Sequence, residues 1–252
     1  MQELAYRVEK RFKFTGKEIR YLLVTVVVAA FVLNFRSWGG DEFSFGEGMT
    51  NLIITGVVVF ISFLIHFAAQ KVVALSMGYV SKYKYWLNGI LISLIVTFFT
   101  YGYFPLFFTG SLWHDTVTKL RVGEFRGGPK HKEIGYIAFA GPLANILIVC
   151  LVAPLYLATE GAFFHTIIVA NLLIAVFSLL PIPTFEKIRQ FKGGTTGLYL
   201  FIASRWLYVL IFLTVLLFTA LILVFKLYSI ILALVIAALI TVVYYTQYEV
   251  NP

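Results

Sequence analysis

The chain has 252 residues, of which 60% are hydrophobic and 13% charged, and its mean hydropathy is +0.90. Soluble domains are about 45–50% apolar and about 25% charged, so this composition excludes an ordinary soluble enzyme and predicts an integral membrane protein. The net charge of +8 does not indicate nucleic-acid binding, because the basic residues form short clusters between apolar runs, as the positive-inside rule expects.

Residues 1–20 are basic, with apolar residues interleaved, and we expect them to form a cytoplasmic segment that lies on the membrane surface. Thr15 and Glu18 have the spacing of a capping box, so the first long helix should begin near Thr15. The apolar run 21–35 then forms the first expected span. It is short, but Arg20 and Arg36 can extend it by snorkelling to the two interfaces.

Five further apolar segments are long enough to be membrane-embedded, at 51–77, 134–158, 163–180, 198–225 and 228–245. With the first span they predict one polytopic domain over residues 21–248. The expected fold class is an all-α membrane protein with six transmembrane helices.

The segment 87–112 is different, because polar and chain-turning residues such as Gly102, Pro105 and Gly110 interrupt its apolar pattern. We expect a re-entrant hairpin or a broken helix here, packed against protein that satisfies its backbone, followed by a cytoplasmic loop at 113–133. Four aromatic residues just before the segment predict an aromatic belt at one interface, namely Tyr79, Tyr83, Tyr85 and Trp86.

This arrangement explains the distribution of charge when the N-terminus is placed in the cytoplasm. All of the 20 Lys and Arg residues except Arg36 and Lys226 then lie on the inner side. A full crossing of 87–112 would move the basic residues of the following loop outside. We therefore expect both termini in the cytoplasm and a location in the cell membrane of a prokaryote, with the lipid bilayer as the first partner.

The sequence His66-Phe67-Ala68-Ala69-Gln70 occupies an apolar helical segment with the spacing of the zinc-protease motif H-E-x-x-H. Residues four apart lie on one face of a helix, so His66 and Gln70 keep the geometry of the two histidines. Phe67 stands where the glutamate base would be, and Gln70 offers an amide in place of imidazole. A catalytic zinc needs about three protein ligands, and this helix supplies one.

Two later motifs follow on consecutive spans. The first is Ala140-Gly141-Pro142-Leu143-Ala144-Asn145, and the second is Leu179-Leu180-Pro181-Ile182-Pro183, preceded by Asn171 and followed by Glu186. With the His66 helix, they resemble the site-2 protease family of intramembrane zinc metalloproteases, in a compact archaeal-type form. The resemblance covers most of the chain and implies a site-2-protease-like core.

In that family the first motif provides two histidine ligands and the glutamate base, and an aspartate after the proline-rich turn provides the third ligand. Here His66 alone is kept as a ligand, Glu186 stands near the place of the aspartate, and Phe67 and Gln70 replace the base and the second histidine. The resemblance therefore implies the fold without proteolysis, with no catalytic residue and no cofactor. His66 is expected to pair with Glu186 or Gln70 inside the protein. The sequence around Glu186 fits an ordinary solvated cytoplasmic loop equally well.

The resemblance also implies a groove that holds a transmembrane helix or another membrane protein as partner, near Gly141, Pro142, Asn145, Pro181 and Pro183. For Asn145 we favour a packing role, because Asn145 can hydrogen-bond across the bundle while Gly141 lets a neighbouring helix approach closely. Pro142 indicates a kink in the same helix.

Two alternatives to an inactive binding protein remain. The first is a working metalloprotease in which His66, Glu186 and a third group such as His114 hold zinc at roughly 2.0–2.2 Å. Asp115 and His131 are less regular ligand candidates, and Cys150, as the single cysteine, allows no thiolate cluster. The second is a transporter or channel subunit, suggested by the broken segment 87–112. The oligomeric state does not follow from the sequence.

Overall fold

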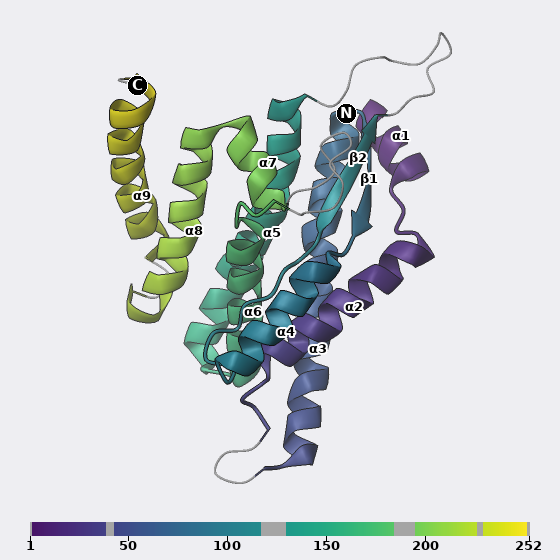
Figure 1. Ribbon diagram of the computed structural model, residues 1–252, viewed down its shortest axis with the longest axis vertical. Helices are drawn as coiled ribbons and strands as arrows, with labels where there is room; N and C mark the ends of the chain where they lie inside the picture. Colours follow the sequence, from purple (N-terminus) through teal and green to yellow (C-terminus); the bar gives the residue numbers. More distant parts are fainter. Residues whose placement is uncertain (1, 39–42, 117–129, 184–194, 226–228, 251–252) are drawn as a thin grey trace. The chain divides into compact units, whose positions relative to one another are not determined.

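The computed structural model describes residues 2–38, 43–116, 130–183, 195–225 and 229–250 (Figure 1). This part of the chain is mostly helical, in agreement with the predicted class. Its α-helices are α1 (Gln2–Arg11), α2 (Gly16–Leu33), α3 (Phe45–Ser76), α4 (Leu87–Phe99), α5 (His131–Thr159), α6 (Ala162–Ser178), α7 (Thr196–Ala203), α8 (Arg205–Phe225) and α9 (Ser229–Tyr245). Two short strands, β1 (Tyr79–Lys84) and β2 (Ser111–Thr116), interrupt this pattern.

The contacts within the chain divide the predicted domain 21–248 into two compact units. The first unit contains residues 1–129 and 184–193, and the second contains residues 130–183 and 194–252. The first unit therefore holds the helix with His66, and the second holds the helices with Asn145 and Asn171. Each unit is described by itself below.

In the first unit, α2 begins directly after Thr15, as the capping box predicts. The Thr15 hydroxyl accepts a hydrogen bond from the Glu18 amide at 3.3 Å, and the Glu18 carboxylate accepts one from the Thr15 amide at 2.8 Å. Two amides that would otherwise lack partners at the helix start are satisfied in this way. The predicted start of the first long helix is confirmed.

The long helix α3 begins at Phe45, six residues before the expected start of the 51–77 segment. Ser44 provides the reason, because its side chain accepts from the Glu47 amide and so caps the helix earlier than the apolar pattern indicates. At the other end, the guanidinium of Arg7 on α1 donates to the Leu75 carbonyl at 3.3 Å. A cation at this end of a helix is favourable, because the last carbonyls carry partial negative charge.

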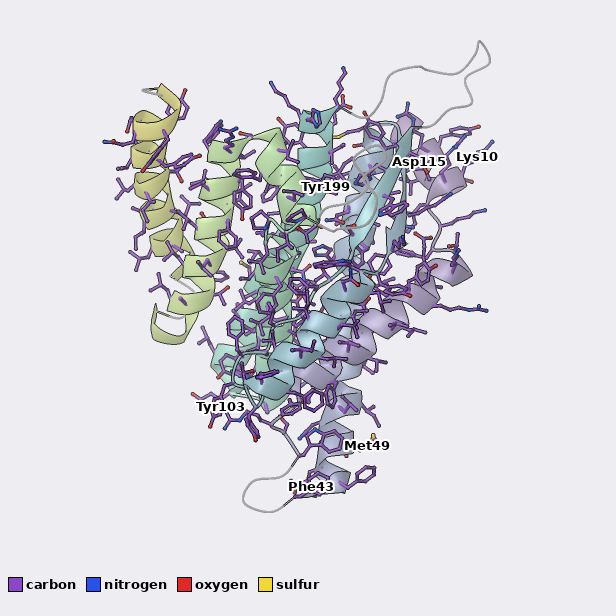
Figure 2. The ribbon with its side chains drawn as sticks, viewed as in Figure 1. Lys10, Phe43, Met49, Tyr103, Asp115 and Tyr199 are labelled. Carbon is purple, nitrogen blue, oxygen red and sulfur yellow. The ribbon has the colours of Figure 1, made fainter. Side chains whose placement is uncertain are left out.

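Helix α3 runs from the end of the first unit that holds Phe43 to the end at which α1 lies (Figure 1 and Figure 2). Figure 2 shows Lys10 and Asp115 near the end at which α1 lies, and Phe43 and Met49 near the opposite end. Phe43 is 76% exposed, although it is a large apolar side chain. The basic segment and the exposed apolar residues therefore lie at opposite ends of one helix.

The segment 87–112 begins and ends beside the two-stranded sheet of β1 and β2. Antiparallel pairing of β1 with β2 makes Lys84 the partner of Ser111, so the two ends of the segment meet. Helix α4 occupies its first half, and the chain then turns back through Gly102 and Gly110, both with positive φ. Positive φ is accessible to glycine at little cost, and a Cβ on Gly110 would also lie 2.7 Å from the Lys84 carbonyl oxygen.

Two sequence predictions for this region are corrected. The expected loop 113–133 starts with strand β2 and ends with the first residues of α5, and its residues 117–129 lie outside the described part. The expected aromatic belt is largely interior, because Tyr79, Tyr83 and Trp86 are 3–6% exposed. Alternation along β1 turns Tyr79 and Tyr83 inward, which a helical interpretation of the segment could not anticipate.

The second unit is a helical bundle in which α5 packs on α6 and α7, and α8 packs on α9. A buried cluster joins four of these helices through Val149, Ala153, Ile168, Leu172, Phe218 and Ala233. Helices α5, α6 and α9 agree with the expected segments to within three residues at each end. The expected continuous segment 198–225 is wrong, since Ser204 has extended backbone and separates α7 from α8.

Helices α3 and α5 are long and apolar enough to cross a membrane. Helices α4, α6, α8 and α9 are also apolar, but each is described over a shorter apolar stretch. By length and composition two of the described helices could thus cross a membrane, and the set of six spans stays a prediction.

The contact between the start of α7 and the end of α6 gives a stability prediction. A Cβ on Gly197 would lie 1.9 Å from the carbonyl oxygen of Leu179, so Gly197→Ala must shift backbone. We expect it to lower the free energy of unfolding by about 1–3 kcal/mol, as overpacking does, measured by thermal unfolding in detergent. Gly56→Ala is the matched control, since its Cβ would meet nothing closer than 4.0 Å and alanine is the better helix former. Equal melting temperatures for the two variants would contradict the prediction.

Candidate functional site

The candidate site is built on the C-terminal half of α3, where His66 and Gln70 lie one turn apart. Their side chains are 0% and 2% exposed, respectively. Both are polar groups removed from solvent within an apolar helix, and each makes interactions inside the chain. The helix therefore presents these two residues with the spacing of a metalloprotease motif, in the interior of the protein.

Phe67, at the position of the missing base, is completely buried among aromatic rings. Its ring stacks on Phe63 with centroids 5.9 Å apart and lies 4.4 Å from the ring of Tyr83 on β1. Phe63 continues the cluster to Phe107, on the chain that returns from α4. Apolar contacts thus fill the place where a protease needs a carboxylate next to its metal-bound water.

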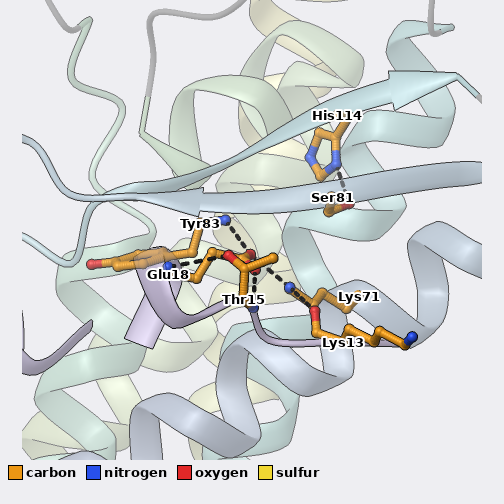
Figure 3. A network of polar contacts seen from close by, with 7 residues as sticks. All are labelled: Lys13, Thr15, Glu18, Lys71, Ser81, Tyr83 and His114. Atoms are coloured by element: carbon orange, nitrogen blue, oxygen red, sulfur yellow. Dashed lines mark hydrogen bonds and ion pairs between the residues drawn. The ribbon is translucent and has the colours of Figure 1, made fainter. Parts of the chain in front are cut away.

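One residue after Gln70, the amine of Lys71 forms an ion pair with Glu18 of α2 at 2.6 Å (Figure 3). Both side chains are 5% exposed. The amine also donates to the Lys13 carbonyl at 2.8 Å and lies 4.2 Å from the centroid of the Phe14 ring. The motif helix is therefore fixed to the start of α2 by a buried charge pair.

Glu18 uses both carboxylate oxygens. One accepts from the Lys71 amine and from the Tyr83 amide at 2.8 Å, and the other accepts from the Thr15 amide and hydroxyl. Burial by itself would raise the pKa of this carboxyl, but the hydrogen bond from Lys71, with those from the two amides, outweighs burial and holds the pKa below its ordinary value. Glu18 is therefore an anion near neutral pH.

Tyr83 joins three elements at this place. Its amide binds Glu18, its ring contacts Phe67, and its hydroxyl donates to the Thr109 carbonyl at 2.8 Å and lies 2.7 Å from the Thr25 hydroxyl. Burial raises the pKa of its hydroxyl, so the side chain stays neutral. No motif identifies Tyr83 in the sequence; its alternation with Tyr79 and Ser81 along a strand is the one signal that could have done so.

The third-ligand candidate His114 lies on β2, opposite Ser81 of β1. Its Nδ1 is 2.7 Å from the Ser81 hydroxyl. Burial lowers the pKa of the imidazole to about 4, although Asp115 acts in the opposite direction, so the ring is neutral near pH 7. Asp115 is exposed at the end of the ribbon, and His131 is exposed at the start of α5 in the other unit.

In the second unit, α5 buries Gly141, Pro142 and Asn145, and α6 buries Asn171. The Asn171 amide donates to the Ile167 carbonyl at 2.8 Å on its own helix. Pro181 and Pro183 lie beyond the end of α6 and are exposed. The five predicted groove residues thus differ in environment, and their assignment to a groove stays a prediction.

Zinc is the cofactor that the motif would imply, and the described residues do not fit it. Within the described ranges, no three His, Cys, Asp or Glu side chains lie close enough to hold a metal ion. His66 is the single motif ligand there, whereas a catalytic site needs about three. Glu186, the remaining predicted ligand, lies outside the described residues.

These features define a mostly helical protein in which His66 and Gln70 keep the spacing of a zinc-protease motif and Phe67 between them is buried in an aromatic cluster. Comparison with known proteins agrees with this class. The chain is 25% identical over 186 residues to the protein named "Putative zinc metalloprotease MJ0611" of Methanocaldococcus jannaschii. The match covers 72% of this chain and 86% of the relative. The chain is thus distantly similar to a protein named as a putative archaeal zinc metalloprotease, which supports the metalloprotease relation that the motifs predict.

No protein-family model and no solved structure matches the chain. The relation therefore depends on this distant relative together with the order of the motifs along the sequence.

The ion pair beside the motif gives a prediction with a defined pH dependence. Lys71→Met leaves the Glu18 carboxylate buried without its cation, and we expect a loss of about 3–5 kcal/mol in the free energy of unfolding near neutral pH. The double variant Glu18→Gln/Lys71→Met is the matched control and should recover a large part of this loss. A single variant as stable as the wild type would contradict the prediction.

The pH dependence follows from the lowered pKa of Glu18. Its contribution to stability is complete above the ordinary pKa of 4.5 and disappears as the pH falls through the lower pKa of the folded state. The difference in unfolding free energy between the wild type and Glu18→Gln should therefore decrease toward acid pH. Denaturation at several pH values measures it.

The aromatic cluster predicts the outcome of restoring the base. Phe67→Glu places a carboxyl between Phe63 and Tyr83, and we expect a loss of about 3–5 kcal/mol, similar to removal of a buried Phe side chain. Phe67→Leu, which keeps an apolar side chain, should lose less. Thermal unfolding of both variants measures the difference. A Phe67→Glu protein as stable as the wild type would show that this position tolerates a carboxylate.

Proposed function

We propose that the chain is a catalytically inactive, site-2-protease-like membrane protein that binds a transmembrane helix or a membrane-protein partner. The observation that carries the proposal is the burial of Phe67 between Phe63 and Tyr83, at the position of the family's catalytic base. The distant relation to a zinc metalloprotease supports the frame, and the chemistry of the motif argues against hydrolysis.

The physical argument is that hydrolysis inside a membrane needs a metal-bound water and a group that accepts its proton. Phe67 accepts no proton, and Gln70 is a weaker ligand than histidine. A chain with this motif keeps helices that can contact a membrane segment while it lacks the groups that would cleave it. In this proposal the protein is multi-pass, with its basic segments in the cytoplasm.

A combined measurement of metal and activity tests the inactive state. We expect purified protein in detergent to contain far less than one zinc per chain by elemental mass spectrometry, with no change in His66→Ala, and to leave membrane peptides intact. The rearranged-ligand alternative requires stoichiometric zinc that is lost in both His66→Ala and Glu186→Ala, together with peptide cleavage. That result would overturn the proposal.

Photo-crosslinking in native membranes tests the binding role. A photoreactive residue at Leu143, which is 42% exposed and adjacent to Pro142, should yield an adduct with one membrane protein in native membranes. Leu239 on α9, which is 65% exposed, is the control position and should give lipid adducts alone. Identical adducts at both positions would contradict a specific partner groove.

A further inference from the structure

The second unit contains a cavity where α5 meets the break between α7 and α8. Its volume is about 460 Å³, and apolar side chains such as Phe139, Leu200 and Leu207 form much of its lining. Ser204, one of the lining residues, has extended backbone, with φ −164° and ψ 112°, between the two helices. Gly135 brings α5 close to this break, since a Cβ there would lie 2.4 Å from the Ala203 Cβ.

A second cavity of about 430 Å³ lies between α8 and α9. Its lining includes Leu210, Ala238, Val242 and Tyr245 and is almost entirely apolar. Trp206 lines both cavities, so the two are adjacent and share one indole side chain. Trp206 is 44% exposed, as expected for a tryptophan at the boundary between lipid and water.

One cation, Lys132, lines the first cavity, and further basic residues adjoin its lining in the chain. Lys132 and Ser204 contribute polar groups to its lining, and Arg205 lies in the chain between the lining residues Ser204 and Trp206. Lys130 and His131 precede Lys132 and are exposed. The carboxylate of Glu133 lies 3.9 Å from the Lys130 amine and reduces this charge in part. A polar, cationic end thus adjoins two apolar cavities.

The volumes of the two cavities limit the size of a ligand that they can hold. A helix about 10 Å in diameter fills roughly 420 Å³ in each turn, so either cavity holds about one turn of a partner helix. A hydrocarbon chain is much narrower and can lie along such a cavity over its length. Two adjacent apolar cavities with a cationic polar group at one end match a molecule with two hydrocarbon chains and an anionic head.

We propose that these cavities form a binding site for one anionic phospholipid, with one chain in each cavity on the two sides of Trp206 and its phosphate near Lys132 and Arg205. Basic residues between helices on the cytoplasmic side attract anionic head groups, and each Lys or Arg near the surface contributes about 1 kcal/mol. The site is independent of whether the chain cleaves peptides, so its test does not depend on the proposed loss of catalysis.

Native mass spectrometry of the full, delipidated chain tests the site with phosphatidylglycerol and phosphatidylcholine of identical acyl chains. We expect one phosphatidylglycerol to bind per chain in preference to phosphatidylcholine. Lys132→Gln/Arg205→Gln should bind it about thirtyfold more weakly, since two charges are lost. The control Lys10→Gln/Lys17→Gln removes the same charge from the first unit and should leave affinity within about threefold, because those residues neither line the cavities nor adjoin a lining residue in the chain.

Two further measurements separate the lipid from simpler ligands. Glycerol phosphate, which has the head group without chains, should fail to displace phosphatidylglycerol, and Ala238→Phe should weaken the two-chain lipid more than a single-chain lysolipid. Phosphatidylglycerol with brominated chains should quench part of the tryptophan fluorescence of the wild type, and this quenching should be lost in Trp206→Phe. Equal binding of the two phospholipids, an equal effect of the control variant, or quenching that persists without Trp206 would overturn the proposal.

Discussion

The ion pair between Glu18 and Lys71 is the interaction on which the first unit depends. It joins the start of α2 to α3, and the same carboxylate holds the Tyr83 amide of β1 and the Thr15 cap. Removing two charges from water is costly, and the attraction between them offsets this cost together with further hydrogen bonds. Glu18 accepts three more, from the Tyr83 amide and from the Thr15 amide and hydroxyl, and Lys71 donates one more to the Lys13 carbonyl. Because Lys71 directly follows Gln70, this pair also fixes the position of the motif along α3. Strand β1, helix α2 and the motif on α3 are therefore connected through one carboxylate.

The aromatic cluster extends this coupling to the position of the missing base. Phe67 and Lys71 are four residues apart on α3 and contact, respectively, the ring of Tyr83 and the carboxylate that binds its amide. The Tyr83 hydroxyl donates to the Thr109 carbonyl on the chain that returns from α4, so the same residue also holds the far end of the segment 87–112. A change at Phe67 is thus transmitted to β1, and a polar side chain there would disturb more than its own cavity. Phe67 is therefore part of the packing of this unit.

The sequence predicted the features that depend on local pattern. The capping box at Thr15, the helical setting of His66 and the extents of α5, α6 and α9 follow from short-range spacing and apolar periodicity, and the structure agrees with them. The β1–β2 ribbon was missed because Tyr79 to Lys84 gains its stability from a partner strand about thirty residues away, and aromatic residues near lysines also suit an interface. The break at Ser204 was missed because only Ser204 and Arg205 interrupt the apolar sequence there, and no glycine or proline marks the position. The Glu18–Lys71 pair joins residues 53 positions apart, which no single-sequence pattern connects.

Filling the position of a catalytic base with an aromatic ring changes the energetics of the whole helix. A carboxylate in an apolar segment is expensive unless it is paired, and a protease accepts that cost because the group works on water. Phenylalanine at the same position removes the cost and adds about 1.5–3 kcal/mol from burial of its side chain. The buried Phe63–Phe67–Tyr83 contacts thus stabilise α3, and a carboxylate at residue 67 would have to give them up.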